Sequence, residues 1–182
     1  MDIVKHIQQH YDNLGVELRK LSIEQIANLK LAVFGFYFLL PNFEEVMKKY
    51  IQIDIDKKKL IVDIKNKNVA DYRKAIEKSN AETDEYADDF EEAEPIEVFI
   101  LEAFADATSD LDDVKSLERL FYGIIDALDC YENFSDNPEY WNNLVEKEII
   151  FQLEILNIIK NQDIFDISIY QKKYINVTFN EL

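Results

Sequence analysis

The ten-residue stretch LAVFGFYFLL, from Leu31 to Leu40, decides the fold class of this chain. It is apolar on every side of a helix, which is typical of a helix buried in the middle of a bundle. Ser22 is placed to cap the start of this helix, and Pro41 ends it because a proline ring clashes with the preceding turn. Ten residues are too few to cross a bilayer. We therefore expect the stretch to form the core helix of an all-α fold.

Helical periodicity continues on both sides of this core helix. The 182 residues contain three Gly and three Pro, which leaves few places for tight turns and disfavours a strand-rich fold. No repeat or linker divides the sequence, and its length suits one domain with a continuous core. We expect residues 1–182 to form a single all-helical domain of about seven to nine helices, wrapped around the helix from Ala27 to Leu40.

Local signals predict several helix boundaries. Gly15 is expected to end the N-terminal helix. Pro95 and Pro138 suit the first turn of two later helices, because proline loses no hydrogen bond at that position. One further helix is predicted from Val69 to about Phe90, so its last turns would be strongly acidic.

The distribution of charge is the strongest indication of function. The chain has 37 Asp and Glu against 20 Lys and Arg, a formal net charge of −17. Between Lys78 and Lys115 it has fourteen Asp and Glu and no Lys or Arg. Nine of these acids lie in ETDEYADDFEEAEPIE, from Glu82 to Glu97. Like charges this close repel one another unless they face water or a cationic partner.

This charge indicates which partners the chain favours. Nucleic acid is disfavoured as a direct ligand, because phosphates bind where Lys and Arg replace their counterions. An anionic membrane surface is disfavoured for the same reason. A basic protein or a cation is the partner type that the charge favours, and the alternative is a solvated surface that only keeps the protein soluble. The candidate partner-binding residues are Asp84, Glu85, Asp88, Asp89, Glu91 and Glu92.

Catalytic and metal-binding signals are sparse. The sequence contains no phosphate loop, dinucleotide fingerprint or nucleophile elbow. His6 and His10 are four residues apart, but the chain has no other His and one Cys to complete a zinc site. We therefore expect two surface histidines, no metal site and no cofactor. Glu148 and Gln152 share a helix face among apolar residues, where the carboxylate could act as a general acid or base or accept a structural hydrogen bond.

Three parts of the chain resemble a known family. Asn137 and Pro138, followed by EIIFQLEIL from Glu148 to Leu156, look like the YjaG-like family of bacterial proteins. The stretch from Leu31 through the junction Leu40–Pro41–Asn42–Phe43 is similar to that family's first core helix and its following turn, and ADDF, from Ala87 to Phe90, also recurs in it. The resemblance implies an all-helical fold. The family has no established activity, so no catalytic residues carry over.

The cysteine content and the N-terminus bear on localisation. Cys130 is the only cysteine, so no intrachain disulfide can form and a reducing compartment is favoured. The N-terminal sequence MDIVKHIQQHYDNL lacks the apolar segment of a secretory signal. We expect a cytoplasmic protein.

Two hypotheses about function remain open. The first is an acidic, non-enzymatic protein-binding module, an immunity or antitoxin-like protein that neutralises a basic toxin such as a nuclease by occupying its cationic active site. The alternative is an enzyme or metal protein whose site is assembled from scattered carboxylates around Glu148, Glu102 and Asp126. The sequence contains no motif that decides between them.

Overall fold

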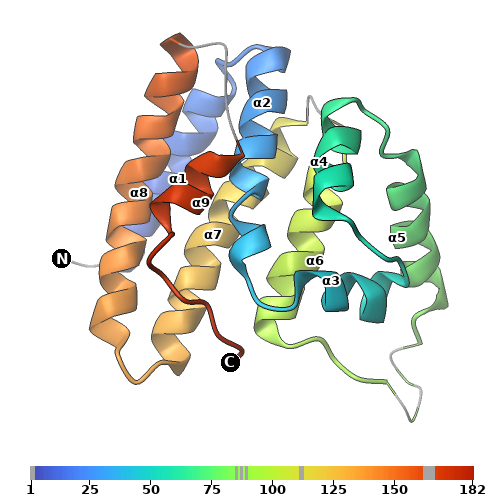
Figure 1. Ribbon diagram of the computed structural model, residues 1–182. Coiled ribbons are helices and arrows are strands. Elements are labelled where there is room, and N and C mark those ends of the chain that lie inside the picture. Colours follow the sequence, from blue (N-terminus) through green and yellow to red (C-terminus); the bar gives the residue numbers. More distant parts are fainter. Residues whose placement is uncertain (1–2, 85, 87, 89, 111–112, 162–166) are drawn as a thin grey trace.

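The computed structural model describes residues 3–84, 86, 88, 90–110, 113–161 and 167–182, and this part of the chain is all-α, without strands (Figure 1). The α-helices are α1 (Ile3–Leu18), α2 (Ile23–Phe34), α3 (Phe43–Val46), α4 (Lys57–Lys65), α5 (Ala70–Glu82), α6 (Pro95–Ala107), α7 (Val114–Phe134), α8 (Pro138–Asn161) and α9 (Ser168–Lys173). A 3₁₀-helix, η1 (Tyr37–Leu39), and a π-helix, η2 (Met47–Ile51), follow α2 and α3. The predicted fold class is confirmed.

Helix α7 lies at the centre of the fold. It packs against α1, α2, α6 and α8, while α9 crosses α2 (Figure 1). Its buried face includes Leu117, Phe121, Ile124 and Leu128, which recur every three or four residues as a core-facing stripe requires. On the other side of α6, helices α4 and α5 form an outer layer. Helix α2, in which the apolar stretch begins, therefore shares the centre of the bundle with α7.

The apolar stretch is buried almost throughout, as predicted, but it is not one helix. Ser22 caps α2 in a reciprocal box, in which Gln25 N donates to Ser22 Oγ (3.2 Å) and Ser22 N donates to Gln25 Oε1 (2.9 Å). The α-helix ends at Phe34, and η1 follows before Pro41. A Cβ on Gly35 would lie 2.5 Å from the carbonyl oxygen of Ile167, so glycine at this break lets the C-terminal segment approach the backbone.

The predicted boundary at Gly15 is wrong, whereas those at Pro95 and Pro138 are confirmed. Helix α1 continues through Gly15 to Leu18, and a Cβ on Gly15 would lie 2.8 Å from Glu118 Oε1. Gly15 therefore admits a neighbouring side chain and does not end the helix. Pro95 and Pro138 are the first residues of α6 and α8, as expected.

Helix α5 ends at Glu82, eight residues before the predicted end at Phe90. Its last favourable pair at helical spacing joins Lys78 Nζ to Glu82 Oε2 (3.8 Å). Beyond Glu82 every charge is negative, and acidic residues three or four positions apart destabilise a helix. The described residues between α5 and α6 are turns and irregular chain.

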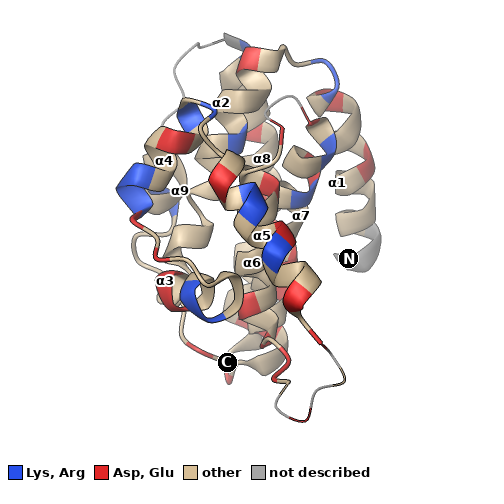
Figure 2. Cartoon of the chain, turned by 90° about the vertical axis from the view of Figure 1, so that its right-hand side faces the viewer, with Lys and Arg blue, Asp and Glu red and all other residues tan. Residues whose placement is uncertain are grey.

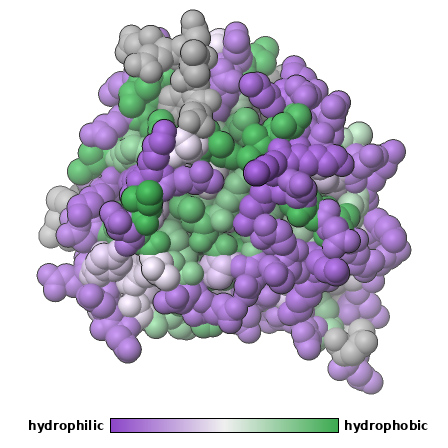
Figure 3. All heavy atoms as spheres, viewed as in Figure 1, coloured by the Kyte–Doolittle hydropathy of each residue, from purple (hydrophilic) through white to green (hydrophobic). Residues whose placement is uncertain are grey.

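The C-terminal segment closes an aromatic cluster over α2 and α8. Phe179 lies 5.5 Å from Phe36 and 5.8 Å from Trp141, measured between ring centroids, and Trp141 stacks on Tyr131 at 4.5 Å. Figure 3 shows hydrophobic residues near the middle of this face and hydrophilic residues around its margin. The tail thus belongs to the core of the fold.

Among the described helices, no single one is both long and apolar enough to cross a bilayer. Ile23–Leu39 and Phe43–Ile51 reach that length and composition only as a pair, and the chain bends by 100° between them.

Candidate functional site

The residues predicted to bind a partner lie in the segment between α5 and α6, residues 83–94, which we call the acidic loop (Figures 1 and 2). Asp84, Asp88, Glu91 and Glu92 are exposed. Glu85 and Asp89 lie outside the described residues. The loop leaves the body of the molecule beyond the end of α5, with its described carboxylates in water.

Among the described residues, cations pair with the acidic stretch from Glu82 to Glu97 only toward its two ends. Lys49 Nζ lies 3.4 Å from Glu91 Oε2 and 4.0 Å from Glu97 Oε1. Lys78 pairs with Glu82 at the end of α5. No ion pair to Asp84, Asp88 or Glu92 occurs within the part of the chain that the structure describes. The middle of the acidic loop therefore keeps its negative charge uncompensated.

The end of the loop next to α6 is held by Glu97. Its Oε2 accepts hydrogen bonds from Tyr50 OH (2.6 Å) and from the backbone N–H of Glu94 (2.8 Å). Burial raises the pKa of Glu97, but these hydrogen bonds and the charge of Lys49 outweigh it, so the net shift is downward. A carboxylate that stays ionised here gives the loop a fixed point on η2.

An aromatic residue stands among the exposed carboxylates. The Tyr86 side chain is 95% exposed, and Phe90, four residues later, is 42% exposed. Tyrosine is enriched where proteins make energetically important contacts, because one rigid ring offers a large apolar surface and a hydroxyl group. Tyr86 was not among the residues predicted to bind a partner, which were chosen by charge alone. Its sequence signal is an aromatic residue between Asp84 and Asp88.

A second candidate site is a cavity of about 350 Å³ between α6 and α7. Glu102 and Asp106 reach it from α6, and Arg119, Tyr122 and Asp126 reach it from α7. The side chains of Glu102 and Asp126 are exposed at its mouth, whereas Asp106 is buried. The structure thus brings together two of the three carboxylates that the alternative hypothesis named.

The three carboxylates of this cavity have raised pKa values. Arg119 Nε donates to both carboxylate oxygens of Asp106, at 3.0 and 3.1 Å, yet burial still raises the pKa of Asp106. Burial and the nearby charges of Asp106 and Asp126 raise the pKa of Glu102. Burial also raises the pKa of Asp126, although its Oδ1 accepts a hydrogen bond from Tyr11 OH (2.9 Å). Raised carboxylate pKa values in a cavity are compatible with proton transfer.

Glu148, the third carboxylate, lies elsewhere and is fully buried. Its Oε1 accepts hydrogen bonds from Gln152 Nε2 (3.0 Å) and Tyr170 OH (2.9 Å). Its Oε2 accepts from Tyr174 OH (2.6 Å) and Lys173 Nζ (2.5 Å). Glu148 therefore fastens the C-terminal segment to α8. The expected site around Glu148, Glu102 and Asp126 is not assembled, because Glu148 does not line the cavity.

His10 joins the same buried network, so the expectation of surface histidines is wrong for this residue. Its side chain is 4% exposed, and Nε2 lies 2.7 Å from Gln152 Oε1. Because the Gln152 NH2 group donates to Glu148 and to Phe121 O, its oxygen must accept a hydrogen bond from His10 Nε2–H. His10 Nδ1 is then a buried acceptor without a partner. Burial lowers the pKa of His10. Across the described residues, no three His, Cys, Asp or Glu side chains are placed to hold a metal ion.

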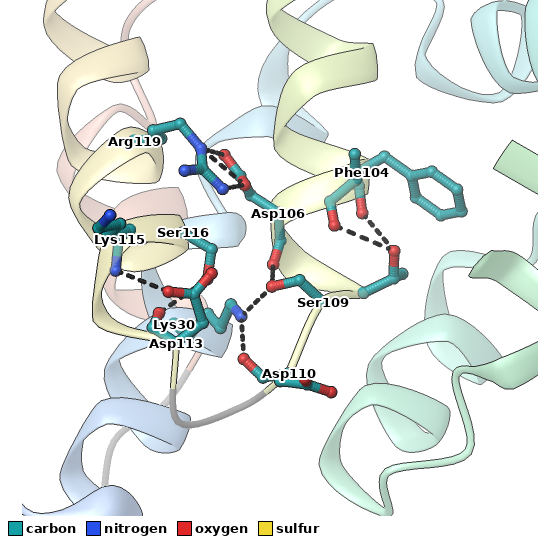
Figure 4. A network of polar contacts seen from close by, with 11 residues as sticks. Lys30, Phe104, Asp106, Ser109, Asp110, Asp113, Lys115, Ser116 and Arg119 are labelled. Carbon is teal, nitrogen blue, oxygen red and sulfur yellow. Dashed lines mark hydrogen bonds and ion pairs between the residues drawn. The ribbon is translucent and has the colours of Figure 1, made fainter. Parts of the chain in front are cut away.

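Lys30 is a buried cation that the sequence analysis missed (Figure 4). It lies on α2 with no exposed surface, and its Nζ donates to Ser109 Oγ (2.7 Å) and to the carbonyl oxygen of Asp110 (2.8 Å). Burial lowers the pKa of Lys30 to about 8. This contact ties α2 to the connection between α6 and α7. Its only sequence signal was a lysine between Leu29 and Leu31, at the start of the apolar stretch.

Comparisons of the chain with known protein families, curated proteins and solved structures find no match. The resemblance to the YjaG-like family therefore stays a prediction.

Proposed function

We propose that this chain is an acidic, non-enzymatic protein-binding module that presents the acidic loop to a basic surface of another protein. The partner that fits best is a basic toxin, such as a nuclease, whose cationic active site the loop would occupy. The chain would then act as an immunity or antitoxin-like protein. The observation that carries the proposal is the exposed middle of the loop, where Asp84, Asp88 and Glu92 have no cationic partner within the described chain.

The energetics of association favour this use of the loop. Surface charges that meet a complementary patch speed encounter and select partners more than they add affinity. Affinity then requires a contact that excludes water, and the almost fully exposed Tyr86 ring is suited to it. The carboxylates would thus speed the encounter with a basic partner, and the Tyr86 ring would supply the contact that holds the partner.

Affinity capture from the native host tests the proposal. Immobilised wild-type protein is compared with the variant D84K/D88K/E91K/E92K at low and at high salt. The matched control is D136K/E139K/E146K/E154K, which reverses four exposed acids on or next to α8 and changes the net charge equally. We expect one basic protein to bind the wild type and the control, to be lost from the loop variant, and to dissociate at high salt. Equal capture by all three proteins would refute the role of the loop.

The toxin assignment needs a separate experiment. The captured partner is expressed alone and together with each variant, and growth is followed. We expect growth arrest by the partner alone, relief by the wild type and the control, and no relief by the loop variant. If the partner is harmless when expressed alone, the chain is still a protein-binding module, but the proposal that its partner is a toxin is refuted.

The cavity between α6 and α7 favours a second candidate, an enzyme or metal protein with a carboxylate-based site. Its support is the raised pKa of Glu102, Asp106 and Asp126, which line this one cavity. Elemental analysis of purified protein, repeated on E102Q/D126N, tests the metal version. Stoichiometric metal that disappears in this variant would favour the second candidate over the first.

A further inference from the structure

The outer layer of the fold is basic, although the protein as a whole is acidic. Residues 57–78, which include α4 and α5 as far as Lys78, hold eight Lys and Arg against three Asp and Glu. Figure 2 shows these cations on α4 and α5, with the acidic loop extending beyond the far end of α5. The charge of the molecule is therefore segregated, and the function proposed above does not use its basic side.

Half of these cations form no ion pair with the residues that the structure describes. Lys57 pairs with Glu44, Arg73 with Asp110 (2.9 Å) and Lys78 with Glu82, and Lys59 Nζ lies 4.0 Å from Asp63 Oδ2. Four exposed lysines of this segment form no ion pair with any described residue: Lys58, Lys65, Lys67 and Lys74.

Two of the unpaired lysines line a hollow of about 660 Å³ at the start of α5. Ile23, Val69 and Ala70 give it an apolar lining, and the Ile23 side chain is 61% exposed. Lys67 and Lys74 supply positive charge. An apolar hollow with cations beside it fits an aromatic side chain that carries carboxylates next to it.

The remaining charges of the hollow leave these two lysines available. Arg73 also lines it, but its guanidinium is engaged by Asp110 and by the carbonyl oxygen of Thr108 (2.6 Å). Glu77, one turn further along α5, is the other acid in the lining. Arg73 and Asp110 balance each other, so the two lysines outnumber the one acid that is left.

We infer that the hollow receives Tyr86 of a second copy of this chain, with Asp84 and Asp88 of that copy paired to Lys67 and Lys74. Two surfaces of the same molecule are complementary in charge, and each combines that charge with apolar surface. Tyr86 is the most exposed large apolar side chain described, and it stands between two acids that have no cationic partner among the described residues. The hollow supplies an apolar lining and two unpaired cations.

The loop of the same copy does not fill its own hollow. The hollow lies at Ala70, the first residue of α5, and the loop starts after Glu82, the last. A helix of this length separates them by about 20 Å. Within one copy the loop instead meets Lys49, which pairs with Glu91.

The loop and the hollow are different surfaces, so the association is head-to-tail and can continue beyond a dimer. It is also weak. A single loop in a hollow buries less surface than a standard interface, and two copies that each carry a charge of −17 repel one another. Near 0.15 M ionic strength this repulsion is screened beyond about 8 Å, whereas the contacts at the interface are shorter. A basic partner on the loop would compete with the second copy.

Sedimentation velocity tests the inference on the full-length protein. We expect the weight-average mass of the wild type to rise with concentration between about 10 and 500 µM, the range in which a small interface assembles. D84K/D88K, Y86S and K67E/K74E should each raise the dissociation constant about tenfold or more. K58E/K65E is the matched control: it changes the net charge as K67E/K74E does, on two unpaired lysines that do not line the hollow, and should still associate.

A mixing experiment decides which surfaces meet. D84K/D88K and K67E/K74E should each be monomeric alone, but their mixture should associate, because the new lysines on either side of Tyr86 then meet the new glutamates of the hollow. A wild type that stays monomeric throughout, a mixture that stays monomeric, or equal loss in K58E/K65E would overturn the inference. The K67E/K74E variant keeps its acidic loop, so capture of the basic partner by this variant reports on the proposed function independently.

Discussion

Replacing Lys30 with methionine should change how the stability of the protein depends on pH. The pKa of this buried lysine is about 8 in the folded state, against 10.5 for an exposed lysine side chain. The unfolded state therefore binds more protons than the folded state between these two values, and the free energy of unfolding rises with pH in this window. Below pH 8 the burial of the charge destabilises the fold in full. From pH 7 to pH 10 the relief amounts to about 2.5 kcal/mol in the wild type, and Lys30→Met removes it.

Urea unfolding followed by far-UV circular dichroism at pH 7, 8, 9 and 10 measures this effect. Tyrosines with raised pKa values also change stability near pH 10, but they are present in both proteins, so the difference between wild type and Lys30→Met isolates the lysine. Lys58→Met, at an exposed lysine of α4, is the control and should run parallel to the wild type. Parallel curves for Lys30→Met as well would mean that Lys30 keeps its ordinary pKa and is not enclosed as the structure places it.

Three further substitutions probe the fold. Glu148→Ala leaves four donors without their acceptor and should lower the free energy of unfolding by about 3–5 kcal/mol, and a loss under 1 kcal/mol in urea unfolding would contradict the buried network. Gly123→Ala places a Cβ 2.6 Å from Tyr37 OH and should cost about 1–3 kcal/mol. Tyr37→Phe should relieve most of that loss, which a double-mutant cycle measures. Ser22→Ala removes the cap of α2 and should cost about 1 kcal/mol by thermal and urea unfolding, with no change in the other helices.

The fold class could be predicted because it depends on local patterns. The apolar stretch, the proline starts of α6 and α8 and the Ser22 cap act within one or two turns of helix, so the sequence displays them directly. The end of α5 at Glu82 also depends on neighbouring acids, whereas the errors at two glycines involve distant residues. Gly15 was predicted to end a helix that in fact continues, because its neighbour Glu118 is remote in sequence. The end of α2 before Gly35 was not predicted, because its neighbour Ile167 is also remote.

The candidate site could be predicted where charge alone decides. Acidic residues without interleaved cations must lie in water, and the described part of the acidic loop does. The environment of Glu148 was hidden, because Tyr170, Lys173 and Tyr174 are 22 to 26 residues away along the chain. The burial of Lys30 was hidden for the same reason, since its acceptors follow α6. Pairing between helices is a tertiary property, and single-helix periodicity does not report it.

The contrast between Glu148 and the acidic loop shows where an interaction of this protein is to be sought. A buried carboxylate is tolerated only when the fold brings donors to it, and Glu148 receives four. The loop carboxylates Asp84, Asp88 and Glu92 receive no cation from the described chain, and repulsion among the acids of this stretch already favours the end of α5 at Glu82. Their mutual repulsion persists in the folded monomer, so any cationic surface that docks on them gains the free energy that this repulsion costs. The segment that the fold leaves electrostatically unsatisfied is therefore the one that a second protein can stabilise most.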